Sequence, residues 1–131
     1  MVTSSCRSRV LVADDEQIIA DTVAQILELS GFTAVAVYSG EQALEAAKVL
    51  SPDILITDVI MGGMNGIQTA SRIQKDFPSC RIILFSGHAA TANLLLDGDR
   101  FEILCKPIHP TALVERCHKL DHLQFVDSHS C

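Results

Sequence analysis

Residues 53–66 read DILITDVIMGGMNG, and this stretch decides the fold class. Its apolar and β-branched run, residues 54–57 (ILIT), leads directly into an acid, Asp58, and then into a glycine-rich loop. A short, near-continuous apolar run without alternation is typical of a strand that is covered on both faces, as in a parallel sheet. The stretch therefore predicts a buried central strand with a carboxylate at its end.

Similar runs recur along the chain at residues 9–13 (RVLVA), 33–38 (TAVAVY), 81–85 (RIILF) and 101–105 (FEILC). Helical segments separate them: Gly31 is placed to end the first, Ser39 to cap the second and Pro78 to stop the third. The fourth, residues 89–97, is short and weakly patterned, and a fifth follows the last run. Five strands alternating with five helices predict an α/β fold, a doubly wound parallel sheet with helices on both faces.

Length and composition narrow the function classes. The chain has 131 residues, 48% hydrophobic and 20% charged, which suits one folded domain. The formal net charge of −6, with no basic stripe, argues against nucleic-acid binding by this domain alone. No apolar run is long enough to span a membrane, and we expect a cytoplasmic protein. The expected domain covers residues 9–124, with loose ends at 1–8 and 125–131.

The five cysteines form no C-x-x-C pair. A reduced cytosolic protein with Cys105 and Cys117 in its core is the favoured interpretation. A disulfide or a zinc site is the alternative.

Polar side chains follow four of the five predicted strands. Asp14 and Asp15 follow the first strand, Asp58 the third, Ser86 the fourth and Lys106 the fifth. Ligands of open α/β sheets bind outside the carboxyl ends of the strands, so these side chains are expected to meet at one edge.

The residue types at this edge indicate phosphoryl transfer. Three carboxylates held close together repel one another, and a divalent cation removes that cost. An all-oxygen site completed by water suits Mg²⁺, with Mn²⁺ also possible. With the cation, the ammonium of Lys106 and the hydroxyl of Ser86 supply what phosphoryl oxygens need. Asp58, on the central strand, is then the candidate nucleophile.

Four motifs together resemble one known family, the receiver domain of two-component response regulators. They are VLVADDE (10–16), DILITDVIMGGMNG (53–66), ILFSG (83–87) and ILCKPI (103–108), and the resemblance covers about residues 8–122. It implies a flavodoxin-like sheet with strand order 2-1-3-4-5. It also implies signalling by phosphorelay rather than a free-standing enzyme, with a sensor histidine kinase or histidine phosphotransfer protein as donor and an unknown downstream protein as target.

The resemblance also assigns roles. Asp58 matches the phosphoacceptor, Asp15 the direct metal ligand and Asp14 the acid that acts through water. The backbone carbonyl of Ile60 matches the third protein ligand.

Beyond the metal ligands, Ser86 matches the Ser/Thr that follows the phosphoryl group, and Lys106 the lysine that pairs with it. A cis bond between Lys106 and Pro107 is expected on the same ground.

The chain departs from the family pattern in three places. Gly62 and Gly63 stand where many members have Pro-Gly, so the loop loses the stiffness of proline. Ile103 replaces the usual aromatic residue, and the stretch from Ser86 to Lys106 is about two residues short. These departures bear on signal output. The resemblance also implies that the side chains of Ile60 and His88 flank the path of the water that hydrolyses the aspartyl phosphate.

Two other functions fit the class of fold. A phosphatase with an aspartyl nucleophile needs a general acid two residues after the nucleophile, where this chain has Ile60. A flavin-binding module would use aromatic side chains to stack on the ring, whereas this chain has no Trp and one Tyr. The receiver interpretation is favoured over both.

Overall fold

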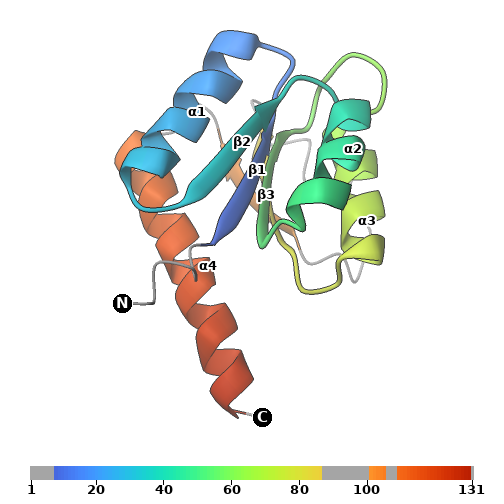
Figure 1. Cartoon of the computed structure of the whole chain (residues 1–131). Coiled ribbons are helices and arrows are strands. Elements are labelled where there is room, and N and C mark those ends of the chain that lie inside the picture. The colour runs from blue at the N-terminus through green and yellow to red at the C-terminus, as the bar shows by residue number, and fades with distance from the viewer. Residues whose placement is uncertain (1–7, 87–100, 106–108, 131) are drawn as a thin grey trace.

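A parallel sheet of five strands forms the centre of the protein (Figure 1). The computed structural model describes residues 8–86, 101–105 and 109–130, without the side chains of 86, 101, 105 and 121–130. The strands are β1 (Arg9–Ala13), β2 (Thr33–Val37), β3 (Ile54–Asp58), β4 (Arg81–Ser86) and β5 (Phe101–Cys105). Their order is β2-β1-β3-β4-β5, and all pairs are parallel. This confirms the predicted fold class and strand order.

The described residues form four helices: α1 (Gln17–Leu29), α2 (Gly40–Leu50), α3 (Gly66–Asp76) and α4 (Pro110–Ser130). In Figure 1, α1 and α4 cover one face of the sheet, and α2 and α3 cover the other. The helix expected at 89–97 lies outside the described residues. The described helices thus give the two-sided cover of a doubly wound fold.

Local signals set the ends of the helices. The Ser39 side chain accepts a hydrogen bond from the Gln42 amide at 3.0 Å, which caps α2 as predicted. Asn65 and Gln68 form a reciprocal capping box at the start of α3. Gly31 has a φ of +103°, so the turn after α1 uses a conformation that favours glycine.

The pleat of the strands divides the core into two halves. Val12 and Ile56 belong to a buried cluster that includes residues of α1 and α4. Their neighbours Leu11 and Leu55 face the opposite way, into a cluster with residues of α2 and α3. Because both sets are fully buried, the strands read as continuous apolar runs in the sequence.

Two observations concern the ends of the expected domain. Ser8 is buried, and its carbonyl accepts a hydrogen bond from the Thr33 amide at 3.0 Å. The backbone of α4 is helical to Ser130, through most of the segment expected to be loose. In Figure 1, the second half of α4 continues past the sheet.

Two cysteines lie in the described core. Cys80 and Cys117 are buried free thiols, and burial raises the pKa of each to about 12. Cys117 is therefore the small core residue that the sequence predicts. The side chain of Cys105 lies outside the described part of the chain.

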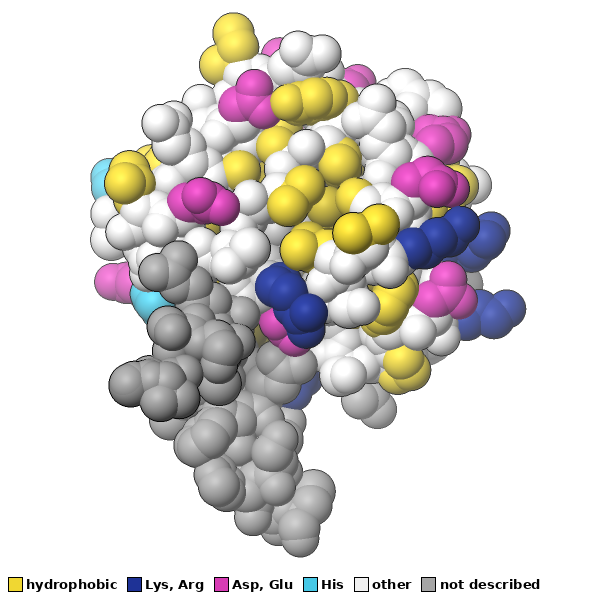
Figure 2. Space-filling model, viewed as in Figure 1, with side chains coloured by type: hydrophobic (Ala, Val, Ile, Leu, Met, Phe, Trp, Pro, Cys, Tyr) yellow, Lys and Arg dark blue, Asp and Glu magenta, His cyan; other side chains and the backbone are white. Residues whose placement is uncertain are grey.

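Hydrophobic side chains also reach the surface, gathered on the face that carries α1, β2 and α2 (Figure 2). Ile18 on α1, Val35 on β2 and Val49 on α2 are exposed. Within the described ranges, no helix combines the length and the apolarity needed to cross a bilayer.

Two leucines of α1 provide a matched test of this packing. Leu27 is 0% exposed and Leu29 is 83% exposed. We expect Leu27→Ala to lower the free energy of unfolding by about 2–5 kcal/mol, because it leaves a cavity between α1 and the sheet. Leu29→Ala should change it by less than about 0.5 kcal/mol. Urea denaturation of both variants measures the difference, and equal losses would contradict this burial pattern.

Candidate functional site

Three carboxylates meet at the carboxyl edge of the sheet. Asp14, Asp15 and Asp58 each offer an oxygen, and these three atoms lie within 4.8 Å of one another. Strand register explains the meeting, since Ala13 of β1 pairs with Thr57 of β3. Asp14 directly follows β1 and Asp58 is the last residue of β3, so the two lie side by side. The structure thus brings together the three acids that the sequence predicts.

Asp14 is fixed by its surroundings. It is 1% exposed, and its backbone amide donates to the Val37 carbonyl of β2 at 3.2 Å. Its Oδ1 accepts a hydrogen bond from the Glu16 amide at 2.9 Å. These contacts hold the carboxylate at the start of α1, whereas the side chain of Asp15 is exposed.

Asp58 is the last residue of β3 and is half-buried. The hydroxyl of Thr57, itself fully buried, donates to the Asp58 carbonyl at 3.0 Å. The Val59 amide donates to the Phe85 carbonyl of β4 at 3.0 Å, so sheet pairing continues just past Asp58. The backbone that carries Asp58 is therefore held from two sides.

Gly66 packs directly against this backbone. A Cβ atom at this position would overlap the Asp58 carbonyl oxygen and lie 2.8 Å from its carbon. The Gly66 amide also donates to the Val59 carbonyl at 2.8 Å. The first residue of α3 can approach β3 this closely only because it has no side chain.

The loop between β3 and α3 runs past the acids. Met61 is buried and Ile60 is 65% exposed, so the loop anchors one side chain and presents the other to solvent. The Gly62 amide donates to Asp15 Oδ2 at 3.3 Å. Gly63 has a φ of +74°, a conformation that other residues adopt only with strain.

Of the other predicted site residues, the structure describes Ser86 and Ile103 but not Lys106, Pro107 or His88. Ser86 ends β4, and its backbone pairs with Cys105 at the end of β5, which places it at the same edge as Asp58. Lys106, Pro107 and His88 lie outside the described residues, as does the expected cis bond. Ile103 is half-buried on β5 and packs against the core cluster beneath α2 and α3.

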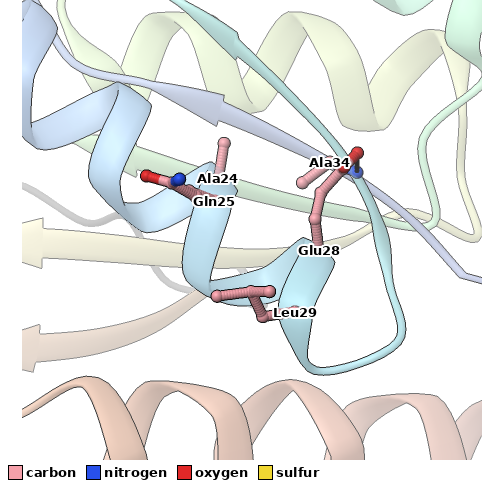
Figure 3. A pocket seen from close by; sticks show the side chains of 5 residues that line it. All are labelled: Ala24, Gln25, Glu28, Leu29 and Ala34. Carbon is pink, nitrogen blue, oxygen red and sulfur yellow. Dashed lines mark hydrogen bonds between the residues drawn. The ribbon is translucent and has the colours of Figure 1, made fainter.

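An open depression of about 460 Å³ lies away from this site, at the far end of α1 (Figure 3). Leu29 and Gln25 line it from α1 and Ala34 from β2. Glu28 Oε2 accepts a hydrogen bond from the Ala34 amide at 3.2 Å. Because Ala34 is at the start of β2, the depression sits toward the amino end of the sheet, opposite the acids.

The chemistry of the acidic cluster fits a hard divalent cation. All three side-chain donors are carboxylate oxygens, with neither thiolate nor imidazole in the cluster. Such a set suits Mg²⁺, which takes a few carboxylates and completes its shell with water or phosphate. The exposure of Asp15 leaves an approach from solvent.

Comparison with known proteins agrees with this geometry. Residues 10–118 match the response regulator receiver domain family. The chain belongs to this family. The receiver domain is 30% identical over 112 residues to the DNA-binding response regulator MtrA of Mycobacterium tuberculosis. That alignment covers 84% of this chain and 49% of MtrA, so the chain spans about half the length of this relative.

Solved structures show the same architecture. A response regulator receiver domain protein from Clostridium thermocellum aligns with a TM-score of 0.81 and 26% identity, covering 91% of this chain and 98% of that one. A CheY-like receiver domain protein from Methanospirillum hungatei gives a TM-score of 0.82 and 25% identity, covering 92% and 98%.

Sequence reasoning missed three supports of the receiver site: the Thr57 hydroxyl, the close approach of Gly66 and the amide of Gly62. Thr57 and Gly66 are part of the motif that carries the resemblance, but nothing in the letters shows what they touch. The contact between Gly62 and Asp15 joins residues 47 positions apart, so local patterns could not reveal it.

Glycine substitutions test how the receiver positions Asp58. Gly66→Ala should lower the free energy of unfolding by about 1–3 kcal/mol, because the Asp58 backbone must move to admit the methyl group. Gly62→Ala is the control, since a Cβ there meets nothing within 4 Å. Denaturant titration measures both, and a fully stable Gly66→Ala variant would contradict the close approach.

Proposed function

We propose that Asp58 accepts a phosphoryl group, in a Mg²⁺-dependent reaction, from a phosphohistidine of a sensor kinase or a phosphotransfer protein. The observation that carries this proposal is the meeting of Asp14, Asp15 and Asp58 oxygens within 4.8 Å at the carboxyl edge of the sheet. Family membership supports it, because response regulators are phosphorylated by histidine kinases. We place this signalling in the cytoplasm.

In the transfer, a carboxylate oxygen of Asp58 forms a bond to phosphorus as the phosphorus–nitrogen bond to the donor histidine breaks. The imidazole leaves with the electron pair of that bond. It leaves as a neutral ring if its other nitrogen already carries a proton, and otherwise it takes up a proton from water. A bound Mg²⁺ supplies positive charge that stabilises the phosphoryl oxygens. Asp14, Asp15 and the Ile60 carbonyl are the groups that would hold it, together with Asp58.

Two further residues complete the proposed chemistry. Lys106 would place an ammonium against the phosphoryl oxygens and Ser86 a hydroxyl donor, each offsetting charge as the group arrives. The position of Ser86 at the end of β4, one strand from Asp58, supports its part. Lys106 follows β5 directly in the sequence.

A phosphatase remains the second candidate and is disfavoured. Turnover would need a general acid two residues after Asp58 to protonate the leaving group. Ile60 stands there, and its hydrocarbon side chain has no acidic proton to give. The arrangement therefore favours a single phosphoryl transfer to Asp58 over the repeated hydrolysis of a phosphate ester.

Phosphorylation is proposed to switch a surface that binds a downstream protein. Ile103 packs on the core cluster beneath α2 and α3, where an aromatic residue would otherwise signal by turning. We propose that the change at Ser86 reaches β5 through repacking of Ile103. The strand register gives a direct route, because Leu84 of β4 pairs with Ile103 of β5.

Labelling tests the phosphoacceptor. Incubation with a small phosphodonor and Mg²⁺ should add one phosphoryl group to the parent chain, measured by intact mass. Asp58→Asn should label far more slowly, because the amide is a poor nucleophile. Chelation of Mg²⁺ should stop labelling of the parent.

Asp76→Asn serves as the control for charge loss, since Asp76 is exposed at the end of α3. It should label like the parent. Equal labelling of Asp58→Asn and Asp76→Asn would place the modification elsewhere.

The lifetime of the aspartyl phosphate tests the role of Ile60. Its apolar side chain can exclude water from the site but cannot orient it by hydrogen bonding. Ile60→Asn should therefore lose the phosphoryl group faster than the parent, and Ile60→Ala should shift the rate by opening the path. The decay of phosphorylated protein, followed by mass, measures this. Val49→Asn, another exposed apolar position, should leave the rate unchanged.

Identical decay rates in the parent and both Ile60 variants would show that this side chain does not control water. The same measurement on His88→Ala tests the second residue expected to flank the path.

A further inference from the structure

In the loop after β3, a backbone N–H contacts Asp15, a candidate metal ligand, and proline at the same position could not make this contact. The Gly62 amide donates to Asp15 Oδ2 at 3.3 Å. Many family members have proline at this position, and proline has no N–H. Glycine in place of proline at position 62 therefore makes the loop less stiff and also adds a hydrogen-bond donor.

The contact joins two segments that the proposed cation site needs. Asp15 follows β1, and Gly62 lies two residues after Ile60. The side chain of Asp15 is exposed, so without a partner it would sample several rotamers. A hydrogen bond to one carboxylate oxygen restricts that sampling and fixes where the other oxygen lies.

We propose that the Gly62 amide is a positioning group for Asp15: it holds Oδ2 and leaves Oδ1 to bind the cation. The role rests on the proposed metal site. Carboxylates that bind metals are commonly held by a second hydrogen bond of this kind, which orients the ligand before the metal arrives. The same contact ties the loop that bears the Ile60 carbonyl to the loop that bears Asp15.

Exchange of the Gly62 amide proton with water tests the contact directly. Labelling with ¹⁵N-glycine gives few signals, because the chain has seven glycines, and Gly62→Ala identifies the one of interest. In the metal-free protein, Asp15→Ala should speed exchange at Gly62 by about threefold to tenfold, the effect of losing one modest hydrogen bond. Gly31, in the turn after α1 near the opposite edge, should not change.

Addition of MgCl₂ to the parent chain then separates positioning from competition. If Gly62 positions Asp15, its amide stays protected when Mg²⁺ binds. Exchange that rises to the Asp15→Ala rate would mean that the cation takes the oxygen from the amide, and the proposal would be wrong.

Two substitutions separate the donor from loop stiffness. Gly62→Pro removes the N–H and stiffens the loop, whereas Gly62→Ala keeps the N–H and meets no atom within 4 Å. Calorimetric titration with MgCl₂ should show about tenfold weaker binding for Gly62→Pro and binding near that of the parent for Gly62→Ala. Equal or tighter binding by Gly62→Pro would overturn the proposal. Denaturation midpoints show whether either variant is misfolded.

These outcomes are distinct from those of the phosphorylation test. A chain that binds Mg²⁺ as described but is not phosphorylated would refute the acceptor role and leave the role of Gly62 standing. A parent chain that binds no Mg²⁺ would overturn the metal site and this positioning role together.

Discussion

Repulsion among three carboxylates is the constraint around which this edge of the protein is arranged. Their oxygens lie within 4.8 Å of one another, a separation at which two unit charges repel by about 1 kcal/mol even at the dielectric constant of water. The sheet holds the acids together because β1 and β3 are neighbours in register, with the start of α1 fixing Asp14. Core packing thus offsets a local cost, and a cation that relieves it gains binding energy.

Backbone contacts, more than side chains, bring the loops to this edge. Gly66 lets α3 begin against the carbonyl of Asp58, and Gly40 plays a comparable part for α2. A Cβ at Gly40 would overlap the Thr69 hydroxyl and lie 3.0 Å from Met64 Cβ. The two helices on this face therefore meet the sheet and each other through glycines. That packing holds the loop between β3 and α3, which runs past Asp15.

The sequence predicts what depends on short-range patterns. Apolar runs located each strand within one residue at either end, because most positions of the central strands are buried and apolar. The strand order came from the motifs. Long-range contacts escaped prediction: nothing near Gly62 indicates Asp15, and nothing in the motif shows that Gly66 touches Asp58. The sequence also does not indicate how far α4 extends, since residues 121–130 include several polar ones and lack a clear apolar stripe.

The two glycines after Met61 and the isoleucine at 103 suggest how a receiver can keep its chemistry while changing its mechanics. Proline and an aromatic ring act through stiffness and bulk, and both are replaced here. The loop is held instead at separate points: Met61 is buried in the core, and Gly62 donates to Asp15. Ile103 packs against the core, in place of an aromatic ring that would turn between two positions. The loop and β5 are therefore restrained by contacts spread along the chain, in place of one stiff ring at each of the two positions.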